Sequence, residues 1–370
     1  MTSDPTTPAG AQPGDDKTVD EVVPVAKNSR DSRPSGRRLS YASRHHLALT
    51  VSILILSAFL TSQSPYFLTT RNLLNVLQQM SFVGIIAFGM TLVIIAGELD
   101  ISVGSMMGFS SALLGQLYVV HEWPMIQAIG VVFAVALVFG FLVGLMRTLF
   151  DVPSFILTLG TFSILSGLAY TMSDAIPVGI SGSWLVRFGT AKPFLDLPSS
   201  GLVMLVILAA IGFTARHTAF GRSVYAVGGN SSAAHLSGIS LARVRIGVLM
   251  LTAGLAALSG LLVSAATGSA QPAIGGGIEF KVFGAVIIGG TLLSGGRGSV
   301  IGTFLGALLV ALLNNGMVLM GVSSFAQDIA GGVVLVVAVM ITSPRFDMGT
   351  VRRMLRRNDE PGVARETGPE

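Results

Sequence analysis

The sequence predicts an all-α polytopic membrane protein with about ten transmembrane helices, and its composition and charge distribution are the two observations that predict it. Of 370 residues, 51% are hydrophobic and 11% are charged, whereas soluble domains carry about 25% charged residues. Residues 1–45 hold 13 charged residues and residues 344–370 hold 11, which leaves 18 for the 298 residues between them. Eighteen charges cannot cover a soluble protein of that size, so lipid must solvate the middle of the chain.

The apolar segments of the chain give the number of crossings. Each crossing of a bilayer takes about 20 mostly apolar residues, and a pass along the chain finds ten such segments. They lie near residues 46–62, 72–96, 101–120, 124–146, 153–172, 201–215, 243–266, 279–294, 299–320 and 324–343.

Two connections between these segments have unusual composition. The stretch 173–200 is too polar and too rich in Gly and Pro to span, and we expect a loop with a short half-helix or a re-entrant turn. Three consecutive glycines weaken a helix, so Gly275–Gly277 predicts an irregular segment just before the helix at 279–294.

Ten crossings place both termini on one side, and Lys and Arg indicate that this side is cytoplasmic. With both tails inside, 19 of the 23 Lys and Arg residues fall on the cytoplasmic side. We therefore predict a disordered N-tail at 1–45, a transmembrane domain at 46–343 and a basic C-tail at 344–370. The N-tail has no apolar core like that of a signal peptide.

Several functional classes are disfavoured by residues that the chain lacks. It has no cysteine, and hence no thiolate metal site or Cys nucleophile. It contains no Gly-Lys pair, which a phosphate-binding P-loop requires. No arrangement indicates catalytic residues, a metal or a cofactor, and the net charge of +4 is mostly in the tails, which disfavours nucleic acid as a partner. Energy for transport must come from a gradient or from another polypeptide.

Ionisable residues bear on the choice between these two energy sources. The five histidines map to tails, helix ends or loops, and Glu98 and Asp100 fall at the turn after the second helix. We find no carboxylate clearly at mid-membrane, and this disfavours a proton-coupled carrier, which usually has ionisable residues within its helices.

Uncharged polar residues within the predicted helices are candidates for a solute pathway. A buried amide must find hydrogen-bond partners, either in another helix or in a wet pathway. Because adjacent residues of a helix lie about 100° apart, Asn314 and Asn315 cannot face the same neighbour, so a pathway role is expected for one of them. An uncharged lining suits a neutral, polyhydroxylated solute. The candidate pathway residues are Gln78, Gln79, Thr158, Gln271, Asn314 and Asn315.

A weak internal similarity links residues 99–115 with residues 295–311. Each stretch begins with a turn, continues through Ser-Val and then places small residues on a helix. The similarity indicates either a repeated helix pair or a recurrence of glycine-rich composition.

The segment 216–245 lies on the cytoplasmic side and is too polar to span. We predict one helical turn at 223–227, a break at Gly228-Gly229, and a short helix at 231–236 that Asn230 caps and Gly238 closes. Two short helices of this kind between the sixth and seventh transmembrane helices form a knob that can dock into a groove on a partner. An ordinary structured loop is the alternative.

Several motifs in a consistent order resemble one transporter family. The chain is similar over residues 46–343 to the membrane-spanning permease of binding-protein-dependent ABC importers of the ribose/xylose/galactoside type. One motif departs from the family pattern: the family usually has Gly-Gly-Ile-Asp-Leu-Ser where this chain has Gly97-Glu98-Leu99-Asp100-Ile101-Ser102, so Glu98 adds a carboxylate at that turn. The motifs are GMTLVIIAGELDISVGS (89–105), GRSVYAVGGNSSAAHLSGI (221–239), SAQPAIGGGIEF (269–280), VIIGGTLLSGGRGSVIGTFLGALL (286–309) and LLNNGMVLMGVSS (312–324).

The resemblance implies a function and a set of partners. It implies a non-enzymatic, multi-pass permease of the bacterial inner membrane that imports a pentose or hexose. An ATP-binding subunit, a solute-binding protein and a second permease copy would be its partners, and ATP would bind to the partner subunit. The segment 221–239 would be the helix that couples the permease to the ATPase, with the coupling residues Gly221, Arg222, Gly228, Asn230, Ala233, Ala234 and Gly238.

Two alternatives to sugar import remain open. An ABC permease of this architecture could carry a branched-chain amino acid, a sugar alcohol or a furanosyl signal. A gradient-driven secondary transporter would instead need an ionisable residue on an unwound helix at mid-membrane.

Overall fold

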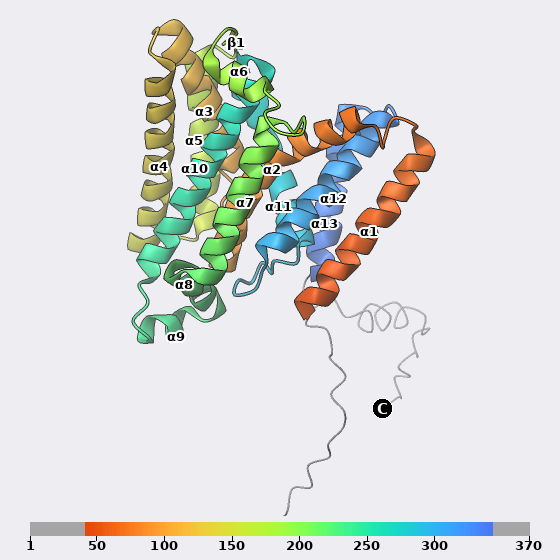
Figure 1. Cartoon of the computed structure of the whole chain (residues 1–370). Coiled ribbons are helices and arrows are strands. Elements are labelled where there is room, and N and C mark those ends of the chain that lie inside the picture. The colour runs from red at the N-terminus through yellow and green to blue at the C-terminus, as the bar shows by residue number, and fades with distance from the viewer. Residues whose placement is uncertain (1–40, 343–370) are drawn as a thin grey trace, which may run out of the picture. The chain divides into compact units, whose positions relative to one another are not determined.

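The structure, a computed structural model, describes residues 41–342 (Figure 1). The predicted N-tail and C-tail lie outside this range, except that residues 41–45 already belong to the first helix, so the predicted start at residue 46 was late. The elements are α1 (Tyr41–Gln63), α2 (Thr70–Ile95), α3 (Val103–Gly115), the π-helical turn η1 (Gln116–Val120), α4 (Met125–Leu149), α5 (Ser154–Ser173), β1 (Val178–Gly179), α6 (Trp184–Thr190), α7 (Ser199–His217), α8 (Ala219–Gly229), α9 (Ser231–Leu236), α10 (Leu241–Thr267), β2 (Ser269–Ala270), the 3-10 turn η2 (Pro272–Gly275), α11 (Ile278–Ile288), α12 (Val300–Leu319) and α13 (Ser324–Thr342).

The helical content confirms the predicted fold class of an all-α polytopic membrane protein. Among the described residues, eight helices are long and apolar enough to cross a membrane: α1, α2, α3 with η1, α4, α5, α7, α10 and α12. The eighth and tenth predicted segments correspond to α11 and α13, of which α13 contributes a shorter apolar helix at Ser324–Met340.

Helix α11 corrects the predicted span at 279–294. It has 11 residues, which at 1.5 Å per residue reach about 16 Å, roughly half of the hydrocarbon core. It ends at Ile288, and the chain continues as a non-helical loop to Ser299. The irregular segment predicted before it is confirmed, since η2 precedes it and Gly277 has a left-handed φ of 74°.

Helices α2 and α10 form the centre of the bundle. In their most apolar 18-residue windows, 78% of the residues of α2 and 61% of those of α10 are buried inside the protein, against 17% for α1. Gly140 and Gly144 let α4 approach the α10 backbone, because a Cβ at either position would lie 2.7 Å from the Cα of Met250 or Ile246. Close packing at these small residues therefore stabilises the contact between α4 and α10, because the hydrophobic effect does not favour helix association within lipid.

The two ends of the bundle carry different short elements (Figure 1). Helices α8 and α9 lie at one end, which we call the α8–α9 end, and α1 begins there, where His45 Nε2 lies 3.0 Å from the carbonyl oxygen of Ile288. At the opposite end β1 pairs antiparallel with β2, with Val178 opposite Ala270. The short helix α6 also lies there, which confirms the predicted loop with a half-helix at 173–200.

Helices α2 and α11 end in the same way. After α2, the N–H groups of Ala96, Gly97 and Glu98 donate to carbonyl groups four, three and five residues earlier, and the N–H groups of residues 289–291 do the same after α11. Gly97 and Gly290 have left-handed φ values of 81° and 88°, as such a helix stop requires. The weak similarity between 99–115 and 295–311 therefore corresponds to a repeated geometry of helix stop, turn and Ser-Val helix start.

A reciprocal amide pair joins α2 to α12. Asn72 Nδ2 donates to Asn315 Oδ1 at 2.9 Å, and Asn315 Nδ2 donates to Asn72 Oδ1 at 2.8 Å. Asn72 Nδ2 also donates to the carbonyl oxygen of Phe67. Both side chains are buried, so the pair satisfies polar groups that would otherwise be costly inside the bundle.

Candidate functional site

Two short helices project from the α8–α9 end as predicted, but the first of them, α8, has other boundaries than predicted. Asn230 caps α9, with its Oδ1 accepting from the N–H of Ala233 at 3.0 Å, and Gly238 closes the helix with a φ of 81°. The predicted break at Gly228-Gly229 is wrong, because α8 continues through both glycines. The single turn predicted at 223–227 is in fact an 11-residue helix that Thr218 caps.

The α8–α9 hairpin has one face packed against the protein and one face exposed. Val224 and Val227 of α8 and Ala234 of α9 are buried, with at most 5% of each side chain exposed. Leu236 is 88% exposed, and Ala233 is exposed on the same short helix. An exposed leucine of this kind on a rigid, capped helix is suited to contact another protein.

A cluster of glycines, which we call the glycine junction, holds the hairpin against two turns of the bundle. It comprises Gly97, Gly228, Gly229, Gly295 and Gly296. Gly296 N–H donates to the carbonyl oxygen of Ile95 at 2.9 Å, and a Cβ on Gly228 would collide with that same oxygen. A Cβ on Gly296 would lie 2.8 Å from the Cα of Gly229. The backbone of α8 therefore contacts both the end of α2 and the loop before α12 directly.

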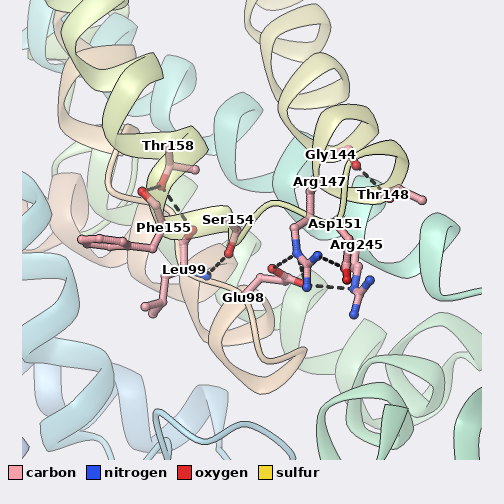
Figure 2. Close-up of polar contacts among 10 residues, drawn as sticks. All are labelled: Glu98, Leu99, Gly144, Arg147, Thr148, Asp151, Ser154, Phe155, Thr158 and Arg245. Atoms are coloured by element: carbon pink, nitrogen blue, oxygen red, sulfur yellow. Dashed lines mark hydrogen bonds and ion pairs between the residues drawn. The ribbon is translucent and has the colours of Figure 1, made fainter. Parts of the chain in front are cut away.

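Glu98 forms an ion cluster next to this junction (Figure 2). Arg147 Nε lies 3.0 Å from Glu98 Oε2 and Arg245 Nε lies 2.9 Å from Glu98 Oε1. Arg147 Nη1 also pairs with Asp151 at 2.7 Å, and this hydrogen bond, with the charge of Arg147, lowers the pKa of the exposed Asp151 carboxyl. Glu98 is 3% exposed, so one buried carboxylate ties the α2–α3 turn to α4 and α10.

The turn after Glu98 is held by the start of α5. Ser154 Oγ accepts from the N–H of Leu99 at 3.0 Å, and Thr158 Oγ1 accepts from the N–H of Ile101 at 3.2 Å (Figure 2 shows both serine and threonine side chains). Asp100 accepts from the N–H and hydroxyl of Ser102 at 2.9 and 2.6 Å. Thr158 thus satisfies the backbone of the α2–α3 turn.

Two cavities lie side by side between α2, α11, α12 and α13. One has a volume of about 250 Å³ and the other about 380 Å³, and Lys281, Asn314 and Gln327 line both. Gln79 lines the smaller cavity and Asp328 the larger. The lining of both cavities is mostly apolar, and its few polar side chains include the charged Lys281 and Asp328, unlike the uncharged lining that the sequence predicted.

The candidate pathway residues separate into different environments. Asn314 and Gln79 line the cavities, whereas Asn315 is occupied by Asn72 and Thr158 by the α2–α3 turn. Gln271 is half-buried, and its backbone N–H donates to Ser111 Oγ at 2.9 Å. Gln78 is half-buried on α2, one residue before Gln79, and lines neither cavity.

Glu279 is a buried carboxylate that the sequence analysis missed. It lies in the first turn of α11, nine residues or about 14 Å along the helix from Ile288. It is 5% exposed and packs against Gly104 of α3, and it lines neither cavity. The available signal was its position two residues after Gly275–Gly277, since an irregular segment exposes the free N–H groups of the next helix. Its Oε2 atom has no hydrogen-bond partner among the described residues.

Comparison with known proteins places these features in a family. Residues 72–342 match the family described as "Branched-chain amino acid transport system / permease component". The chain is 44% identical over 312 residues to the probable ABC transporter permease protein YphD of Escherichia coli, covering 83% of this chain and 93% of that protein. It is 36% identical over 299 residues to the ribose import permease protein RbsC of the same organism, covering 80% and 92%. The RbsC protein of Bacillus subtilis is 37% identical over 304 residues, covering 80% and 90%. No solved structure matches the chain.

Replacing Glu98 with Gln should destabilise the protein. The substitution leaves two partly buried guanidinium groups facing each other without their carboxylate, and breaking a buried ion pair in this way costs about 3 kcal/mol. The thermal unfolding midpoint of the purified protein in detergent measures the effect. Asp151→Asn is the matched control, because Asp151 is 89% exposed and screened by solvent. Equal midpoints for Glu98→Gln and the native chain would show that the cluster contributes nothing to stability.

Adjacent alanine substitutions at the glycine junction should have opposite effects. Gly228→Ala places a methyl group on the Ile95 carbonyl and should destabilise by about 1–3 kcal/mol, with faster amide hydrogen exchange in α8. Gly229→Ala meets nothing within 4 Å and should stabilise by about 0.5–1 kcal/mol, because alanine favours a helix over glycine. Similar exchange rates in α8 for both variants would contradict the close approach of the two backbones.

Proposed function

The chain belongs to the family of ABC transporter permease components described above, and we propose that it imports a sugar as one half of a paired permease. As a member of that family it is a multi-pass protein of the inner membrane and a transport subunit rather than an enzyme. The family implies two further partners, an ATP-binding subunit and a solute-binding protein. The cargo, the second permease copy and the residues that meet each partner are the parts that we propose.

The observation that carries the proposal is the two-faced α8–α9 hairpin. Its exposed face presents Leu236 and Ala233, and its inner face is locked to the glycine junction. We assign the exposed face of α9 to the groove of the ATP-binding subunit, with Asn230 setting its start. Gly221, Gly228 and Gly238 shape the hairpin, and Ala234 packs it against the bundle. Arg222 is exposed on α8, where it can meet the same partner.

Lys and Arg support a cytoplasmic position for the α8–α9 end. Positive residues favour cytoplasmic loops, and six of the arginines between residues 46 and 343 belong to the α8–α9 hairpin, its flanking helix ends or the turns beside it. They are Arg147, Arg216, Arg222, Arg243, Arg245 and Arg297. This orientation puts the hairpin within reach of a cytoplasmic ATPase, and it puts both termini inside.

The contacts of the hairpin indicate how ATPase movement reaches the membrane helices. A displacement of α9 moves α8, whose backbone meets the end of α2 and the loop before α12 with no side chain between them. The Glu98 cluster joins the same turn to α4 and α10. Since backbone contacts of this kind cannot be compressed, α2 and α12 should follow the hairpin as a rigid unit.

The two cavities beside α11 are the proposed solute pathway. Gln79, Asn314 and Gln327 offer amides that hydrogen-bond sugar hydroxyls, and relatives named as ribose import permeases support a sugar cargo. Lys281 and Asp328 add charges that a zwitterionic amino acid could also use. Competition of radiolabelled ribose uptake by excess xylose or by excess leucine distinguishes the two cargo classes, and displacement by leucine would contradict a sugar importer.

Replacing Leu236 with Glu should uncouple ATP hydrolysis from uptake. The substitution puts a charge on the face assigned to the ATPase groove, whereas the exposed position leaves folding unchanged. In proteoliposomes that hold the permease, the ATP-binding subunit and the solute-binding protein, we expect uptake to fall at least tenfold, which corresponds to about 1.4 kcal/mol of lost coupling. Ala219→Glu places the same charge at the exposed start of α8 and is the control. Unchanged uptake by Leu236→Glu would remove α9 from the interface, and uptake without the ATP-binding subunit would contradict the whole proposal.

Substitutions at Asn314 and Asn315 should separate transport from stability. Asn315→Leu leaves Asn72 without its partner and should destabilise the chain by about 1–3 kcal/mol. Asn314→Leu removes an amide only from the cavities, so the unfolding midpoint should stay within about 0.5 kcal/mol of the native value while uptake falls. A native uptake rate for Asn314→Leu would exclude this residue from the pathway.

A further inference from the structure

A further cavity lies at the α8–α9 end, apart from the proposed solute pathway. It has a volume of about 600 Å³ and is bordered by α1, α7, α8 and the start of α12. Its lining residues are His46, Leu205, Leu208, Ala209, Gly212, Phe213, Ala215, Arg216, His217, Tyr225, Gly298, Ser299, Val300 and Ile301. Neither the coupling hairpin nor the solute pathway accounts for this cavity.

The lining changes from apolar to basic along α7. The helix contributes an aliphatic and aromatic wall from Leu205 to Phe213 and then ends in Arg216 and His217. His46 of α1 faces this basic end, where its Nε2 would lie 3.2 Å from a Cβ on Gly302 in the first turn of α12. The cavity therefore has an apolar arm within the membrane-spanning part of α7 and a cationic head at the membrane edge.

The cationic head carries no compensating acid. The lining contains no Asp or Glu, and no carboxylate of the described residues lies within ion-pair distance of Arg216. The first turn of α12 adds backbone N–H groups and the positive end of its dipole. Tyr225 closes the side towards α8 by donating to the carbonyl oxygen of Gly298 at 3.1 Å. This part of the protein is complementary to a negatively charged group.

We propose that the cavity binds one anionic phospholipid, with the phosphate at Arg216, His46 and His217 and an acyl chain along the apolar arm. The apolar arm favours a lipid over a soluble phosphate, because Leu205, Phe213 and Ile301 are 40–62% exposed on the outside of the bundle. The α8–α9 end, which we assign to the cytoplasm, meets the leaflet where anionic lipids attract basic groups. The bound lipid would join α1, α7, α8 and α12 next to the coupling hairpin.

Native mass spectrometry of the full-length protein in mixed micelles tests the proposal. The probes are phosphatidylglycerol and phosphatidylcholine with the same acyl chains. We expect the native chain to retain one phosphatidylglycerol and no phosphatidylcholine. Arg216→Gln should weaken retention about fivefold, the loss expected for one basic residue near an anionic headgroup, and Arg216→Lys should preserve it. Arg243→Gln removes an exposed arginine outside the cavity and is the matched control.

A second variant tests the apolar arm without changing charge. A side chain at Gly212 meets nothing within 4 Å, so Gly212→Trp can fill the cavity and should expel the lipid while the chain remains folded. Equal retention by native, Arg216→Gln and Gly212→Trp chains would overturn the proposal. Displacement of the lipid by inorganic phosphate would assign the site to a soluble anion instead. A change of oligomeric state in Gly212→Trp with unchanged lipid retention would assign the cavity to a second permease copy, and would also overturn it.

Discussion

The rest of this structure depends on the need to satisfy every backbone polar group where water is absent. A helix that ends against other helices leaves N–H and C=O groups without partners, as happens after the full-length α2 and at the start of the half-length α11. After α2, left-handed Gly97 turns the chain, and Ser154 and Thr158 of α5 accept the exposed N–H groups of the turn. At the start of α11, the buried carboxylate of Glu279 lies in the first turn of the helix, where backbone N–H groups are free. Each interruption therefore has specific side chains beside its free backbone groups.

These interruptions place function at the ends of helices. The stop after α2 brings its last carbonyl, that of Ile95, against the backbone of α8, where the glycine junction leaves no space between them. The half-length α11 borders the two cavities, whose few polar side chains belong to the proposed solute pathway.

The sequence predicted the class of fold, the position of nearly every long helix and the capped helix α9, because apolar length and cap residues are local signals. Features that depend on partners distant in the chain were missed. Gly228 and Gly229 look like a helix break, yet their purpose is contact with residues more than sixty positions away. Glu98 looked like a departure from a family pattern, and its reason lies in Arg147 and Arg245. Helical phase predicted correctly that Asn314 and Asn315 face different surroundings, but the structure was needed to assign Asn315 to Asn72.

The two faces of the α8–α9 hairpin are under different constraints. On the inner face, Gly228 and Gly296 admit no side chain without moving the backbone of α2, of α8 or of the loop before α12. On the outer face, the side chains of Ala233, His235 and Leu236 are exposed and are not packed inside the permease. A lineage can therefore change which ATPase it pairs with by substitutions on the outer face alone. After a gene duplication, two permeases can in this way pair with different ATP-binding subunits while the solute pathway stays the same.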